Sequence, residues 1–191
     1  MSYRGYSAGG GFFGFPPAIS QLVLVNVVVF LAQPIFLNSI LTDGLALVPH
    51  QVVRGMVWEL VTYMFLHGGF MHLFFNMLGL IIFGSELERG WGSRDFLKYY
   101  FVTGIGAGLV QVVTSYVGGT PYTVVIGASG AVYGLILAFA LAFPQRTLVL
   151  FPFMIPVQAR TMAIIYAAVA LFSGLSGGGS RIMSKRSLTR V

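Results

Sequence analysis

The stretch VVIGASGAVYGLILAFALAF at residues 124–143 is twenty residues long and contains no charged side chain. A helix needs about 20 mainly apolar residues to cross the hydrocarbon core of a bilayer, which is roughly 30 Å thick. The stretch therefore predicts a membrane-spanning helix. Four further apolar segments accompany it, at residues 19–36, 70–87, 96–117 and 161–175, the last preceded by a proline-interrupted stretch at 151–156. The fold class predicted is an all-α membrane protein, a polytopic bundle with five spans.

The composition of the whole chain also indicates a membrane environment. Of the 191 residues, 57% are hydrophobic and 8% are charged, and the mean hydropathy is +0.86. Soluble domains carry about 25% charged residues, so this chain has too few charges to cover a water-exposed surface and needs lipid as its solvent. The chain has no cysteine, which excludes disulfides, thiol nucleophiles and thiolate metal sites.

The basic residues indicate an orientation. The net charge is +6, but the eleven Lys and Arg are scattered, which is typical of topology signals and not of nucleic-acid binding. With the N-terminus in the cytoplasm, six basic residues lie inside and only Arg54 lies outside before the tail; the six are Arg4, Arg89, Arg94, Lys98, Arg146 and Arg160. We therefore expect a multi-pass protein of the cell (inner) membrane with a cytoplasmic N-terminus and no cleavable signal peptide.

The sequence suggests three regions. Residues 1–18 are expected to be a cytoplasmic segment, residues 19–175 the membrane domain, and residues 176–191 a Gly/Ser-rich, basic tail. The long connection at residues 37–66 is unusually apolar for a loop in water, so we expect it to lie in or on the bilayer against other helices. After five spans the tail would lie outside, where its four basic residues oppose the rule that positive charges stay inside.

Two clusters of polar residues interrupt the apolar segments. His72 and Asn76 are spaced i and i+4 and share one helix face, with His67 at the mouth of the segment. Polar residues inside membranes are costly and often functional, although they also serve as hydrogen bonds between helices. From these residues alone, both interpretations stand.

The second cluster is Gly127-Ala128-Ser129-Gly130, followed by Gly134. Gly130 and Gly134 form a GxxxG pattern, which is typical of close helix packing, and serine is common in such faces. The alternative is catalytic. Small neighbours would let a substrate backbone approach the Ser129 hydroxyl, and a helix beginning near Ser129 would direct free N–H groups at a developing oxyanion.

Taken together, these motifs resemble the rhomboid family of intramembrane serine proteases. The resemblance rests on His67, His72 and Asn76 in the second segment and on Gly127-Ala128-Ser129-Gly130 at the start of the fourth. The apolar connection, the Glu and Gly-Ser residues after the second segment and the Gly-rich third segment also match the family pattern. The resemblance covers about residues 19–181.

The resemblance implies roles for individual residues. Ser129 would be the nucleophile, and His72 and Asn76 would help backbone N–H groups to stabilise the oxyanion. The supporting residues would be His67, Gly127, Ala128 and Gly130, with Glu88 stabilising loop architecture. The reaction would be cleavage of single-pass transmembrane proteins within the lipid bilayer by acyl transfer. No cofactor, metal or nucleic acid is implied.

The sequence departs from the family pattern at the general base. That base is a histidine in a sixth helix, after a Gly-rich loop, and such a loop is present at residues 176–180. No histidine follows Ser129, because the three in the chain are His50, His67 and His72. A serine without a base is a weak nucleophile. We therefore expect this chain to be inactive or nearly so as a protease. We also expect loss of the sixth helix to expose the small-residue face made by Gly127, Gly130, Ala131 and Gly134.

Three explanations of this departure are open. The tail reflects a truncation or frameshift, or the chain is a non-catalytic relative that binds membrane proteins, or another chain supplies the sixth helix. We favour the first, since the motifs are intact up to residue 180. A small transporter or channel with His72 and Asn76 as pore residues is a further hypothesis, although the chain shows no inverted repeats.

Overall fold

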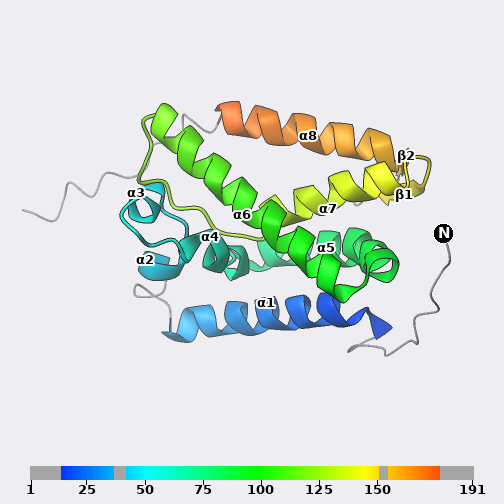
Figure 1. The fold of residues 1–191 in the computed structure, drawn as a ribbon, viewed down its shortest axis with the longest axis horizontal. Coiled ribbons are helices and arrows are strands. Elements are labelled where there is room, and N and C mark those ends of the chain that lie inside the picture. The colour runs from blue at the N-terminus through cyan, green and yellow to red at the C-terminus, as the bar shows by residue number, and fades with distance from the viewer. Residues whose placement is uncertain (1–13, 37–41, 151–154, 177–191) are drawn as a thin grey trace, which may run out of the picture.

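The computed structural model describes residues 14–36, 42–150 and 155–176. Its long helices form a bundle: α1 (Pro17–Phe36), α5 (Phe70–Trp91), α6 (Ser93–Val117), α7 (Ser129–Ala142) and α8 (Ala159–Ser176). The five apolar segments expected from the sequence correspond one to one to these helices. α1 and α8 lie on opposite sides of the bundle, with α5, α6 and α7 between them (Figure 1). The helical, polytopic fold class is thereby confirmed. The expected tail lies almost entirely outside the described residues, as does most of the expected N-terminal segment.

The helix that carries Ser129 is shorter than its apolar segment. α1, α5 and α6 are long and apolar enough to cross a membrane, whereas α7 has 14 residues. At about 1.5 Å per residue, α7 spans only about 21 Å. The apolar segment expected over residues 124–143 is thus longer than the helix, which begins at Ser129 as the catalytic interpretation required, because the loop before it turns at Gly127 with a φ of 116°. The apolar segment is thus divided between a loop and a helix, and Ser129 is the first helical residue.

The connection between α1 and α5 is folded onto the bundle. It contains α2 (Thr42–Leu45), α3 (Pro49–Val52), α4 (Glu59–Thr62) and the 3-10 turn η2 (Tyr63–Phe65). α3 and α4 contact α6, and Leu47 and Met64 are fully buried. Leu47 also exchanges two main-chain hydrogen bonds with Val125, in the loop before α7. The expectation that this apolar connection packs against other helices is confirmed.

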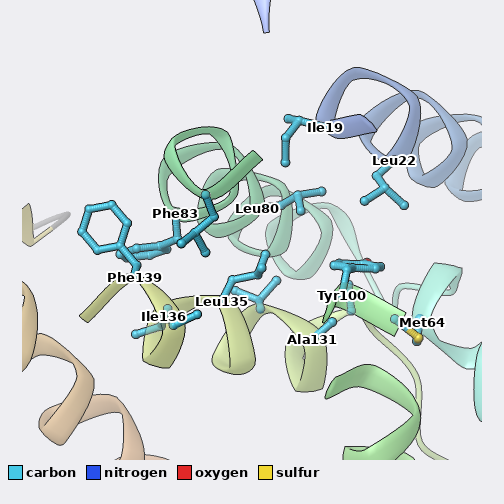
Figure 2. Close-up of a cluster of buried hydrophobic side chains, with 14 of the residues drawn as sticks. Ile19, Leu22, Met64, Leu80, Phe83, Tyr100, Ala131, Leu135, Ile136 and Phe139 are labelled. Carbon is cyan, nitrogen blue, oxygen red and sulfur yellow. The ribbon is translucent and has the colours of Figure 1, made fainter. Parts of the chain in front are cut away.

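The core is centred on α7, which contacts α5, α6 and α8. Figure 2 shows Leu135, Ile136 and Phe139 of α7 lying toward Leu80 and Phe83 of α5. The rings of Phe83 and Phe139 meet edge to face, with centroids 5.5 Å apart. Because α7 is buried on several sides, the position of Ser129 is determined by three neighbouring helices.

A short hairpin separates α7 from α8, at the end of the bundle shown in Figure 1. Strands β1 (Thr147–Leu150) and β2 (Ile155–Gln158) are antiparallel, and Leu148 pairs with Val157. The sequence predicted only a proline-interrupted stretch here, of which residues 151–154 lie outside the described part. The helical bundle therefore includes one two-stranded element that the helix-based expectation did not contain.

A buried carboxylate joins the starts of two helices. Glu88, near the end of α5, accepts hydrogen bonds from the main-chain N–H groups of Ala18 and Ile19 at 2.8 and 2.9 Å, and from Ser93 Oγ at 2.6 Å. The first N–H groups of a helix have no partner within it, and the helix dipole favours negative charge there. Glu88 therefore acts as a distant cap for α1 and also contacts the first residue of α6.

A second buried carboxyl group, Glu59, lies in the connection. Its side chain is 0% exposed, and one oxygen accepts a hydrogen bond from the Val48 N–H at 2.9 Å. The other oxygen has no partner among the described residues. Burial raises the pKa of Glu59, and the hydrogen bond from Val48 opposes this only in part. A carboxyl group with a raised folded-state pKa stabilises the fold at low pH, and this stabilisation is lost as the pH rises through that pKa.

We therefore expect Glu59→Gln to stabilise the protein at pH 8 by about 1–3 kcal/mol, because the amide can still accept from Val48 and carries no charge to bury. The parent should become less stable as the pH rises above 4.5, the ordinary pKa of a glutamate side chain such as Glu59. The variant should not show this decrease. Thermal unfolding in detergent at pH 5, 6, 7 and 8 measures both effects. Asp95→Asn, at an exposed ion pair with Lys98, is the control. A variant less stable than the parent at pH 8 would contradict the expectation.

Candidate active site

The loop before α7 directs Ser129 into the bundle. The Gly127 N–H donates to the Tyr63 carbonyl at 2.9 Å, and the Val132 N–H donates to the Ala128 carbonyl at 3.0 Å as the first turn of the helix forms. The N–H groups at the first positions of α7 have no acceptor within the helix. Ser129 thus stands beside a group of free N–H donors, which is the arrangement that the catalytic interpretation requires.

His72 and Asn76 lie one turn apart on α5. Asn76 Nδ2 donates to the His72 carbonyl at 2.8 Å and keeps a second N–H free. The Gly68 N–H donates to His72 Nδ1 at 3.3 Å. In a neutral imidazole the other nitrogen then carries the proton, so His72 presents an N–H donor at Nε2.

The Nε2 side of His72 lies against the turn before Ser129. A Cβ atom placed on Gly127 would lie 2.6 Å from His72 Nε2, so only glycine fits at this position. The φ of 116° at Gly127 also disfavours any other residue. The glycine before the serine is therefore required both by the backbone conformation and by the approach of the imidazole.

One cavity brings these residues together. It has a volume of about 630 Å³ and lies between α5, α7, α8 and the hairpin, with His72, Asn76 and Ser129 in its wall. The roles that the family resemblance implies for Ser129, His72 and Asn76 require the three residues to share one site. They do share this cavity, and most of its wall is apolar, with side chains such as Phe75, Ile136 and Met162. A chain segment of apolar character can therefore lie next to a small set of polar groups.

The supporting residues have distinct places. His67 lies in the connection before α5, is 1% exposed, and its ring meets that of His72 edge-on, with centroids 5.1 Å apart. Burial, together with the neighbouring His72, lowers the pKa of His67 to about 4. Ala128 is buried in the core, and Gly130 packs against Ala107 of α6. His50 lies elsewhere, against the ring of Tyr122 at 4.5 Å.

The small-residue face of α7 is not exposed, and the expectation that it would be was wrong. Gly127 and Ala131 are buried, and Gly134 packs so closely on Thr103 that an added Cβ would lie 2.6 Å from it. Gly130 and Gly134 form the close contact with α6 that a GxxxG pattern predicts. The open face of α7 instead contains Tyr133, Leu137 and Leu141.

Gln33, a residue that no sequence motif singled out, holds the main chain of His67 with both ends of its amide. A polar amide within the apolar segment 19–36 was the available signal.

No group of three or more His, Cys, Asp or Glu side chains placed to hold a metal occurs within residues 14–36, 42–150 and 155–176.

Comparison with known proteins decides the family. The family model described as the Rhomboid domain matches residues 54–182, which include α5, α6, α7 and α8. This chain belongs to the rhomboid family. It is therefore an integral membrane protein with a polytopic helical fold, related to intramembrane serine proteases.

Individual rhomboid relatives show the extent of the similarity. Rhomboid protease AarA of Providencia stuartii is 30% identical over 179 residues, covering 82% of this chain and 63% of that protein. Putative rhomboid protease YdcA of Bacillus subtilis (strain 168) is 39% identical over 84 residues, covering 44% and 40%. RHOMBOID-like protein 5 of Arabidopsis thaliana is 36% identical over 111 residues, covering 54% and 35%. The matched part thus spans less than two thirds of the length of each of these rhomboid relatives.

Proposed function

We propose that this chain forms the membrane-embedded catalytic core of a rhomboid-type serine endopeptidase that cleaves single-pass transmembrane proteins. The observation that carries the proposal is the shared cavity, where Ser129 at the start of α7 lies with His72 and Asn76 of α5. An exposed patch or a lone serine would not favour catalysis. Catalysis is favoured when one cavity contains a nucleophile, an imidazole that bears an N–H, and an amide.

The proposed reaction is acyl transfer. Ser129 Oγ attacks the carbonyl carbon of the scissile peptide, and the hydroxyl proton passes to a base while the carbonyl oxygen becomes an oxyanion. The free N–H groups at the start of α7, His72 Nε2–H and the Asn76 amide are the donors that would stabilise this charge. Collapse of the intermediate breaks the C–N bond and releases the amine with the proton. Water then hydrolyses the acyl-serine.

The base is proposed to come from outside the described residues. His72 cannot be both base and donor, since its Nδ1 accepts from Gly68 and its Nε2 carries the proton. His67, with a pKa of about 4, is a poor base at neutral pH. A helix carrying a histidine could pack along the open face of α7, where Ser129, Tyr133 and Leu137 are spaced i, i+4 and i+8. The same polypeptide or a second one could provide that helix.

Without such a helix, the same cavity favours a second function, namely binding without cleavage. The apolar wall formed by α5 and α8 suits a transmembrane segment of another protein. A serine-reactive fluorophosphonate distinguishes the two functions. Labelling of Ser129, lost in Ser129→Ala, supports the endopeptidase. Capture of a transmembrane segment with no labelling, even after a histidine helix is added, supports the non-catalytic binder.

The role of Asn76 is testable in a chain extended by a sixth helix with one histidine. We expect Asn76→Ala to lower kcat by about 10²–10³, with a much smaller rise in KM, because an oxyanion donor acts mainly in the transition state. Cleavage of a transmembrane reporter in liposomes measures both constants. Gln111→Ala, at a polar residue of α6 outside the cavity wall, is the matched control. An unchanged kcat in a folded variant would assign Asn76 to packing.

We further propose that the N-terminus is cytoplasmic and the protein resides in the cell (inner) membrane. Arg89 and Arg146 both lie near the Glu86 carboxylate, at 3.3 and 4.0 Å, so basic residues from distant parts of the chain meet at one end of the bundle. Positive charge accumulates on the cytoplasmic side of membrane proteins. Arg54 follows α3, and α3 lies at the opposite end of the bundle from the hairpin beside Arg146 (Figure 1).

The absence of cysteine makes this orientation simple to measure. We expect Arg94→Cys to react with an impermeant maleimide only after the cytoplasmic face is opened, because position 94 is exposed at the start of α6. Arg54→Cys should react in intact spheroplasts, since position 54 is exposed in the connection. The parent chain is the blank. The opposite pattern would reverse the proposed orientation.

A further inference from the structure

Gln33 links α1 to the connection before α5 through the main chain of one residue. Gln33 Nε2 donates to the His67 carbonyl at 2.9 Å, and the His67 N–H donates to Gln33 Oε1 at 3.0 Å. Both polar ends of the amide therefore bind the same residue, 34 positions further along the chain. A paired contact of this kind restrains position and orientation together, as a single hydrogen bond does not.

The restrained residue lies next to the group that determines the tautomer of His72. Gly68 follows His67 directly, and its N–H is the donor to His72 Nδ1 at 3.3 Å. The His67 ring also packs edge-on against the His72 ring, at 5.1 Å between centroids. The position of His67 thus reaches His72 by two routes, one through the main chain and one through the ring.

This segment needs an external restraint. His67 is followed by Gly68 and Gly69, and Gly69 precedes α5 without a side-chain cap. Glycine loses more conformational freedom on ordering than any other residue, so two in succession hold a donor poorly by themselves. A hydrogen bond in a protein interior is also electrostatically stronger than one in water. The amide of Gln33 satisfies the His67 main chain at the point where local structure ends.

We propose that Gln33 is a positioning residue for His72: by holding the His67 main chain, it keeps the Gly68 N–H on His72 Nδ1 and the Nε2 proton of His72 directed at the turn before Ser129. The meaning of this arrangement for catalysis rests on the proposed function. The tautomer itself does not, and it can be measured whether or not the chain cleaves anything.

The test uses ¹⁵N-histidine-labelled chain in lipid bilayers, studied by solid-state NMR at pH 8, where an ordinary imidazole is neutral. The chain has three histidines, so His50, His67 and His72 can each be assigned by single replacement. The parent should show one His72 tautomer, protonated at Nε2. In Gln33→Met, which keeps the length of the side chain but has no amide, the ratio of the two tautomers should change by about 2- to 10-fold, the range that one hydrogen bond controls.

Two controls separate positioning from general disruption. Gln21→Met removes an exposed glutamine from the same helix and should leave all three imidazoles unchanged. His50, which contacts Tyr122 at 4.5 Å, reports whether the fold is intact. If Gln33→Met moves the His50 signals, Gln33→Asn becomes the test variant instead. The asparagine amide is one methylene too short to reach His67. An unchanged His72 tautomer in whichever variant retains the parent His50 signals overturns the inference.

The outcome is separable from that of the proposed function. If Gln33→Met shifts the His72 tautomer while Asn76→Ala leaves kcat of the extended chain unchanged, the positioning role stands and the assigned oxyanion donors are wrong. If Asn76→Ala lowers kcat as expected while the tautomer is the same in parent and Gln33 variants, the proposed function stands and the inference about Gln33 fails.

Discussion

A polypeptide of these 191 residues, purified and placed in lipid, is expected to leave a cleavable transmembrane reporter intact. Loss of the nucleophile or of its histidine in serine proteases lowers kcat by about 10⁶-fold, and the residual rate comes from the oxyanion site and from binding. In the proposed reaction Ser129 must lose its proton as it attacks, and none of the three histidines has both the position and the free nitrogen needed to accept it.

The geometry gives a separate reason why each of the three histidines is unsuited to act as the base. His72 uses Nδ1 to accept from Gly68, so its Nε2 faces the site as a donor. His67 is buried with a pKa of about 4 and does not belong to the cavity wall. His50, in α3 of the connection, packs on Tyr122 and is not part of that wall. The donors proposed for the oxyanion therefore lie within the described residues, whereas no histidine among the described residues is placed to accept the proton.

The measurement compares parent, Ser129→Ala and a chain extended by a helix with one histidine among small residues. Parent and Ser129→Ala should give the same background, and the extended chain should cleave the reporter in a Ser129-dependent manner. The extended chain with that histidine replaced by alanine is the matched control. Robust Ser129-dependent turnover by the parent would contradict the expectation and would place the base on His67, His72 or a second copy of the chain.

Glu88→Ala is expected to destabilise the bundle by roughly 5 kcal/mol, or to prevent folding. A hydrogen bond to a charged group contributes about 1.5–3 kcal/mol, and Glu88 accepts three, from Ala18, Ile19 and Ser93. Removal of the carboxylate leaves two buried N–H groups at the start of α1 without an acceptor. Since natural domains are stable by only about 5–15 kcal/mol, one substitution can remove much of the total.

Unfolding in mixed micelles of increasing denaturing-detergent content measures this effect. Glu86→Ala is the control two residues away, because Glu86 is partly exposed and pairs with Arg89 at the surface. Surface pairs contribute about 0–1 kcal/mol, so the control should lie close to the parent. Glu88→Gln should fall between the two, since an amide oxygen can satisfy some of the donors. A Glu88→Ala variant as stable as the Glu86 control would show that α1 is not held by its cap.

The sequence was sufficient for those features that depend on local composition. Apolar runs free of charge predicted the long helices, because lipid cannot satisfy exposed backbone groups and a helix satisfies them internally. The i, i+4 spacing of His72 and Asn76 placed both on one face of a helix, and the small residues around Ser129 marked a position of close approach. These properties follow from residues near one another in the chain, so no knowledge of packing was needed.

Other features depend on contacts between distant residues, and only the tertiary structure decided them. The start of α7 at Ser129 depends on Gly127, whose positive φ is held by the Tyr63 carbonyl from the connection. The small face of α7 is covered by α6, which the pattern of glycines could not specify because several helices were available as partners. Glu88 and Gln33 act on main-chain groups 70 and 34 residues away. A sequence shows which side chains can form hydrogen bonds, but the fold alone determines which backbone groups come within reach of them.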